Sequence, residues 1–113
     1  MTLALQRLDA EVSVAPQLGP EAMAEAKAAG FRSVINNRPD FEAGPTQPTN
    51  ASVEAAARAA GLEYAYLPVA PTVQSADEIA RFRELIGAMP KPILAFCRSG
   101  TRSGKLWRAA TGR

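Results

Sequence analysis

Short apolar segments alternate with alanine-rich segments along the whole chain, and a glycine or a proline separates most of them. The apolar segments have the length and composition of strands, whereas the alanine-rich segments favour helices. We expect strands at residues 8–14, 31–36, 63–69 and 93–96, and helices at residues 21–29, 51–60, 76–89 and 103–113. This alternation predicts an α/β protein whose mostly parallel, four-stranded sheet is flanked by helices.

Local signals support several of these boundaries. Pro20 suits the first position of a helix, and Gly30 and Gly61 stand where helices commonly end. Ser75 and Glu78 have the spacing of a capping box, which indicates a helix start. In the parallel sheet of an α/β protein, ligands bind at the carboxyl ends of the strands, so the residues that follow each strand are the first candidates for a site.

Length and composition limit the class of protein. A chain of 113 residues suits one domain, over residues 1–113, and 47% apolar with 21% charged residues is ordinary for a globular fold. No apolar run approaches the roughly 18 residues of a membrane span, and the N-terminus does not resemble a signal peptide. A single cysteine excludes an intramolecular disulfide. We therefore expect a cytoplasmic protein without a membrane partner.

The chain contains no histidine. It cannot by itself build a Ser-His-Asp triad, a Cys-His dyad or a histidine-containing zinc site. We expect no metal and no cofactor, and any catalysis must proceed without imidazole.

Charge is distributed unevenly. Residues 1–90 carry seven basic and eleven acidic side chains, whereas residues 91–113 carry six basic side chains and no acidic one. A basic segment can bind nucleic acid, but this one lacks the interleaved aromatic residues of a base-stacking surface. We expect no nucleic-acid partner and interpret the excess charge as a local anion site.

The stretch from Cys97 to Ser103 joins the last apolar strand to the last helix. Its backbone N–H groups can surround an anion at the positive end of that helix. Candidate anion-binding residues are Arg98, Ser99, Gly100, Thr101 and Ser103. Arg102 can fold over an oxyanion with its planar guanidinium. The same field favours the thiolate of Cys97, which makes Cys97 and Arg102 the candidate catalytic residues.

Four stretches resemble known proteins: QLGPE (17–21), GFRSVINNRPD (30–40), AARAAGLEY (56–64) and LAFCRSGTRS (94–103). The last is similar to the active-site loops of rhodanese-type sulfurtransferases and of cysteine-dependent phosphatases. The wider layout resembles the phosphatase-like domain of the β-lactamase-hydrolase-like proteins, also called a sulfur transferase family. The resemblance implies a dual-specificity-phosphatase-like sandwich, and a metallo-β-lactamase-fold dioxygenase as a partner.

The loop departs from the phosphatase pattern, which has a histidine before the cysteine and five residues between cysteine and arginine. Here Phe96 precedes Cys97, and only four residues separate Cys97 from Arg102. The shorter loop is similar to many rhodanese loops. Our first hypothesis is therefore a sulfurtransferase that passes sulfane sulfur through a Cys97 persulfide, because its leaving groups need no strong acid.

Two alternatives stay open. One is a phosphate monoester hydrolase that acts through a phosphocysteine at Cys97; Asp40 is then a candidate general acid and Arg38 an auxiliary cation, although Asp40 could equally form a turn. The other is a non-catalytic anion-binding module. In each case the partner is a small anion that contains sulfur or phosphate.

Overall fold

The computed structural model describes residues 3–113 and contains a five-stranded sheet in the order β1-β2-β5-β3-β4. The strands are β1 (Gln6–Arg7), β2 (Val12–Ala15), β3 (Ser33–Asn36), β4 (Glu63–Tyr66) and β5 (Ile93–Phe96). Strands β2, β5, β3 and β4 are parallel, and β1 pairs antiparallel with β2. The expected α/β fold with a mostly parallel sheet is confirmed.

The sheet has one strand more than the sequence predicts. Residues 8–14 were expected to form a single strand, but a turn at Asp9 divides this region. The Asp9 carboxylate accepts hydrogen bonds from the backbone N–H groups of Glu11 and Val12, at 2.8 Å each. This side-chain capping of a turn lets Gln6–Arg7 fold back onto β2, and a local apolar pattern does not reveal it.

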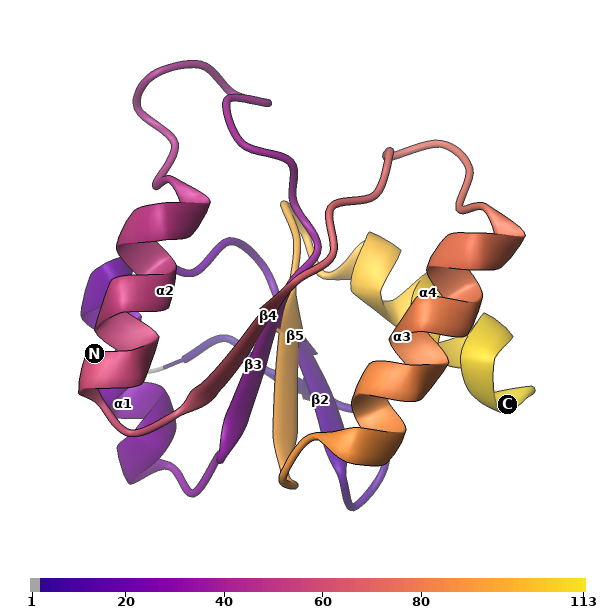
Figure 1. Ribbon diagram of the computed structural model, residues 1–113, viewed down its shortest axis with the longest axis horizontal. Helices are drawn as coiled ribbons and strands as arrows, with labels where there is room; N and C mark the ends of the chain where they lie inside the picture. Colours follow the sequence, from indigo (N-terminus) through magenta and orange to yellow (C-terminus); the bar gives the residue numbers. More distant parts are fainter. Residues whose placement is uncertain (1–2) are drawn as a thin grey trace.

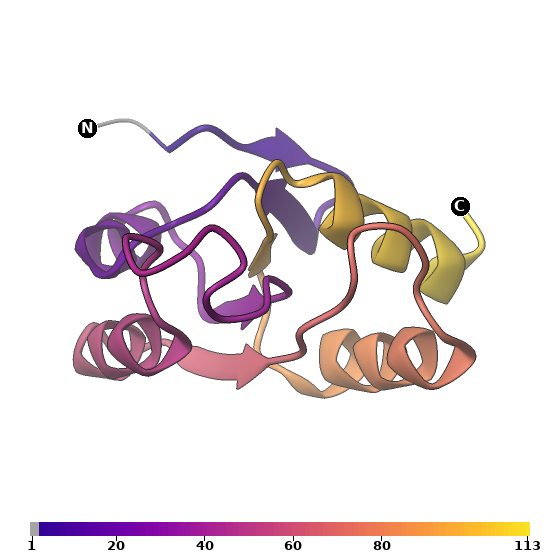
Figure 2. The ribbon, with the colours of Figure 1, turned by 90° about the horizontal axis from the view of Figure 1, so that it is seen from above.

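Helices cover both faces of the sheet. A 3-10 turn η1 (Pro20–Ala22), α1 (Met23–Ala28) and α2 (Asn50–Ala59) lie on one face, and α3 (Ala76–Ala88) and α4 (Thr101–Thr111) lie on the other (Figures 1 and 2). The predicted capping box at Ser75 and Glu78 is confirmed. None of the helices within residues 3–113 has the length and hydropathy needed to cross a membrane.

Central strand β5 supplies both cores. Leu94 and Phe96 pack with the α1 and α2 residues, whereas Ile93 and Ala95 pack with the α3 and α4 residues. All four side chains are fully buried, which fits an apolar strand covered on both faces. Trp107 lies in the second core, as its position on the last helix predicts.

The loops that follow the parallel strands meet at one edge of the sheet, at the top of Figure 1. Backbone hydrogen bonds connect them: Gln17 N–H donates to the Arg98 carbonyl at 3.2 Å, and Asn37 N–H donates to the Phe96 carbonyl at 2.8 Å. Segments far apart in the sequence therefore line one site, at the edge where such sheets bind ligands.

Candidate active site

The loop from Cys97 to Gly100 connects β5 to α4 and turns its backbone toward the cysteine. Gly100 adopts φ 91° and caps the N-terminus of α4, and its N–H donates to Cys97 Sγ at 3.0 Å. A hydrogen bond from a backbone N–H stabilises a thiolate more than a thiol, because the acceptor carries the negative charge. The structure thus brings the predicted nucleophile, loop and helix N-terminus together.

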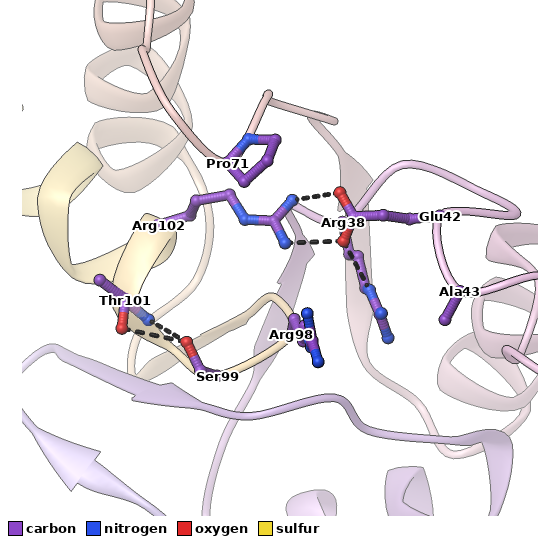
Figure 3. Close-up of a pocket in the computed structure, with 8 residues that line it drawn as sticks. All are labelled: Arg38, Glu42, Ala43, Pro71, Arg98, Ser99, Thr101 and Arg102. Atoms are coloured by element: carbon purple, nitrogen blue, oxygen red, sulfur yellow. Dashed lines mark hydrogen bonds and ion pairs between the residues drawn. The ribbon is translucent and has the colours of Figure 1, made fainter.

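Cys97 has no exposed surface. A pocket of about 550 Å³ is lined by later residues of the segment that begins at Cys97 and by residues of two other loops. Its lining residues are Arg38, Glu42, Ala43, Pro71, Arg98, Ser99, Thr101 and Arg102 (Figure 3). Five of the predicted site residues therefore line one pocket, whereas the buried Cys97 is not among its lining residues.

Arg102 is buried and ion-paired rather than free. Its Nη1 and Nη2 donate to the two carboxylate oxygens of Glu42, at 2.9 and 2.7 Å, and Nη1 also donates to the Val69 carbonyl at 3.1 Å. This pairing is bidentate, the geometry that fixes a guanidinium most firmly.

The pairing with Glu42 uses only one edge of the Arg102 guanidinium. The Nε–H and the second Nη2 hydrogen have no partner among residues 3–113, and they form the other edge of the same planar group. In Figure 3 this edge faces the side of the pocket on which Ser99 and Arg98 lie. Arg102 can therefore bind an oxyanion while Glu42 holds it.

Arg38 is the second buried cation of the pocket. Its Nε donates to Glu42 Oε1 at 2.9 Å and its Nη1 to Gln17 Oε1 at 3.1 Å, and only 7% of its side chain is exposed. Its buried position favours the predicted auxiliary role over that of a solvated surface charge.

Glu42 is the site residue that the sequence analysis missed. Its hydrogen bond with Arg102, and then that with Arg38, hold the pKa of its carboxyl below the ordinary value, against the opposing effect of burial. The carboxyl is therefore ionised and accepts hydrogen bonds at neutral pH. The one sequence signal for Glu42 is its position in the loop that follows the strand expected at 31–36, because the residues after a parallel strand are candidates for a site.

An unusual backbone conformation places Glu42. The preceding residue, Phe41, has φ 63°, a left-handed conformation that bulky residues rarely adopt. Gln47 holds the loop closed, because its Oε1 accepts from the Ala43 N–H and its Nε2 donates to the Pro39 carbonyl, both at 2.9 Å. Hydrogen bonds within the loop, together with the long-range ion pair between Glu42 and Arg102, hold this turn in place.

Two predicted residues have structural partners. Asp40 Oδ1 accepts from the Asn50 N–H at 2.7 Å, beside the start of α2, and Asp40 is absent from the pocket lining. Ser103 is fully buried, and its hydroxyl donates to Asn37 Oδ1 at 2.8 Å. The Asp40 carboxylate thus makes a structural contact outside the pocket lining, and the Ser103 hydroxyl fixes α4 against the loop after β3.

No cluster of three or more histidine, cysteine, aspartate or glutamate side chains with the arrangement of a metal site occurs within residues 3–113. The site is a cationic pocket with one carboxylate. What it can do chemically depends on the thiol of Cys97 and on the guanidinium groups.

A family model described as the phosphatase-like domain of β-lactamase hydrolase-like proteins matches residues 4–112. A curated β-lactamase hydrolase-like protein of Agrobacterium fabrum is 37% identical over 102 residues, which cover 89% of this chain but 23% of that protein. The chain thus spans about a quarter of the curated relative's length.

Solved structures share the fold. A candidate phosphatase from Neisseria meningitidis Z2491 is 34% identical, with a TM-score of 0.88 over 99% of this chain and 81% of that one. TpbA of Pseudomonas aeruginosa, solved in complex with phosphotyrosine, is 15% identical, with a TM-score of 0.70 over 97% of this chain and 65% of that one. The second similarity concerns the fold alone.

Proposed function

Because this chain belongs to the family of phosphatase-like domains of β-lactamase hydrolase-like proteins, we propose that it is a cysteine-dependent phosphate monoester hydrolase. The observation that carries this proposal is the free edge of Arg102, held by Glu42 and turned toward the loop that begins at Cys97. The proposal reverses our first hypothesis of sulfur transfer, because the family model and the Neisseria structure are named for phosphatases, and none of the proteins described above is named for a sulfurtransferase.

The proposed reaction has two displacements at phosphorus. The Cys97 thiolate attacks the phosphorus, so that an S–P bond forms while the P–O bond to the leaving group breaks. Water then attacks the phosphocysteine, the S–P bond breaks, and inorganic phosphate leaves with the thiolate restored. The free Arg102 edge and the N–H groups at the start of α4 bind the phosphoryl oxygens, whose charge they stabilise in both transition states.

The pocket holds no protonated acid for the leaving oxygen. Glu42 is the only carboxyl group among the described residues that line the pocket, and the two arginines keep that carboxyl ionised. The leaving group must therefore depart as a weakly basic oxyanion or take its proton from water. We expect aryl phosphates to be hydrolysed faster than alkyl phosphates.

The same feature favours sulfur transfer as a second candidate. A thiolate that attacks thiosulfate expels sulfite, which needs no proton donor, and the outer sulfur of the Cys97 persulfide then passes to an acceptor thiolate. The four-residue spacing between Cys97 and Arg102 also fits this reaction.

A dioxygenase partner and a cytoplasmic location stay predictions.

A direct comparison tests both candidates. Purified protein and the Cys97→Ser variant are assayed with p-nitrophenyl phosphate and with thiosulfate plus cyanide. Adducts on Cys97 are trapped by acid quenching, and their masses are measured by mass spectrometry. We expect phosphate release that Cys97→Ser abolishes, and a phosphoryl adduct. A sulfur adduct with thiocyanate formation would establish sulfur transfer instead, and no turnover of either compound would leave the anion-binding module.

A further inference from the structure

The pocket has more positive charge than one bound oxyanion needs. Three guanidinium groups, those of Arg38, Arg98 and Arg102, face one carboxylate, that of Glu42, which leaves a formal excess of two positive charges. Uncompensated like charges in a pocket repel each other and attract anions. The excess is a property of the pocket itself, because all four side chains line it.

Arg98 is the cation without a protein partner. It is exposed, and its guanidinium makes no hydrogen bond and no ion pair with any of residues 3–113. Arg38 also keeps one nitrogen, Nη2, without a partner in the described chain, because Glu42 takes Nε and Gln17 takes Nη1. Both side chains extend into the part of the pocket opposite Pro71 (Figure 3).

The size and lining of the pocket indicate what kind of molecule can use these groups. Its volume of about 550 Å³ exceeds that of a single oxyanion and lies in the range of about 300–1,000 Å³ of small-molecule sites. Only Ala43 and Pro71 among the lining residues are apolar, and no aromatic side chain lines it. The pocket thus recognises charge rather than an aromatic ring.

We infer that the site takes small molecules that carry two anionic groups. The first group binds the free edge of Arg102 and the N–H groups beside Cys97, and the second binds between Arg38 and Arg98. Arg98 is then a specificity-determining residue, because its side chain meets only the second group. The inference rests on the proposed function in that the first group is the phosphate to be cleaved.

Binding measurements separate this inference from catalysis. Calorimetric titrations of the Cys97→Ser variant, in about 150 mM salt to screen distant charges, compare fructose 6-phosphate with fructose 1,6-bisphosphate, and inorganic phosphate with pyrophosphate. The two bis-anions differ in the distance between their anionic groups, so the comparison covers a short and a long spacing. We expect at least one bis-anion to bind about tenfold more tightly than its single-anion counterpart.

Second variants, made in the same Cys97→Ser background, test the part played by Arg98. Arg98→Gln is expected to reduce the preference for the bis-anion to about threefold or less, whereas Arg98→Lys keeps part of it. Lys105→Gln removes an equal charge from an exposed residue of α4 that does not line the pocket, and it should preserve the preference. Circular dichroism confirms that each variant is folded.

Equal binding of single anions and bis-anions would overturn the inference. So would a preference that survives in Arg98→Gln, or one that Lys105→Gln removes to the same extent, because net charge alone would then explain it. The hydrolase proposal fails separately, through the absence of p-nitrophenyl phosphate turnover, and that result leaves the binding comparison decisive.

Discussion

Two buried arginines share one carboxylate at the centre of the site. Arg38 and Arg102 have 7% and 6% of their side chains exposed, and both donate to Glu42, whose side chain is 23% exposed. Charged hydrogen bonds between partly buried side chains are stronger than exposed ion pairs, and the loss of one partner leaves the remaining charged groups unpaired. We therefore expect Glu42 to act as a positioning residue, through Arg102.

Replacing Glu42 by glutamine tests this role. In Glu42→Gln the carboxamide has only one acceptor oxygen, so we expect the variant to lose about 1–3 kcal/mol of unfolding free energy in urea. We also expect kcat for p-nitrophenyl phosphate to fall by about 10- to 100-fold, because Arg102 is no longer oriented. Glu54→Gln, which disrupts an exposed pair with Arg58, is the control. Its stability should change by less than about 0.5 kcal/mol, and an equal loss in both variants would contradict the assignment.

The ionisation of Glu42 makes the stability of the protein depend on pH in acid. The pKa of Glu42 is lower in the folded protein than its ordinary value of 4.5, so the unfolded chain binds a proton more readily. Its stabilising contribution is present above that ordinary value and is lost as the pH falls through the folded-state pKa. Urea titrations between about pH 6 and pH 3 should show a steeper loss for the wild type than for Glu42→Gln. Parallel curves would show that other carboxyl groups control acid unfolding.

At the scale of an element, the junction between β5 and α4 determines the shape of the site. Gly100 stands at this junction with φ 91°, and a Cβ there would lie 3.4 Å from the backbone of Ala15. A glycine adopts this conformation at little cost, whereas any residue with a Cβ is strained in it. A residue with a Cβ at this position would therefore strain the turn that donates the Gly100 N–H to Cys97.

The Gly100→Ala substitution tests the importance of this junction. We expect a destabilisation of about 1–2 kcal/mol, together with a loss of most hydrolase activity, because the loop shifts away from Cys97. Gly112 provides a matched control, since its φ is 74° and nothing lies within 4 Å of an added Cβ. Gly112→Ala should have a similar backbone cost and keep its activity, as measured by urea unfolding and p-nitrophenyl phosphate turnover. Activity that survives in Gly100→Ala would show that the N–H contact is dispensable.

At the scale of the whole molecule, two hydrophobic cores lie on opposite faces of the same sheet. Met23 and Phe82 are fully buried on opposite faces, and β5 contributes side chains to both cores. A domain of this size has a total stability of only about 5–15 kcal/mol, so neither core can remain folded when the other is lost. We therefore expect the sheet to couple the two halves into one folding unit, and the site to form only when both halves are folded.

This coupling predicts a single unfolding transition. Met23→Ala and Phe82→Ala should each lower the unfolding free energy by about 2–5 kcal/mol. Tryptophan fluorescence reports the core that holds Trp107, whereas circular dichroism reports all helices. The two signals should give the same midpoint in both variants. Different midpoints in Met23→Ala would show that the two faces unfold separately.

Several expectations from the sequence follow from local chemistry and are confirmed. The strand at 93–96 has the bounds of β5, and the capping box at Ser75 begins α3. The strand expected at 63–69 ends earlier, at Tyr66, and α4 begins at Thr101, two residues before the expected start at 103. Boundaries shift because pairing with neighbouring strands and the cap at Gly100 decide them, whereas side-chain preference decides only the type of element.

The α/β order of elements and the composition of the loop from Cys97 to Arg102 could be predicted from the sequence, because both depend on residues that are neighbours in the chain. Three features of the site depend on tertiary structure: Glu42 holds both arginines, the Asp40 carboxylate accepts from the Asn50 N–H outside the pocket lining, and Arg98 has no partner among residues 3–113. These facts depend on loops that lie far apart in the chain and meet where parallel strands end. No local pattern records which side chains meet there.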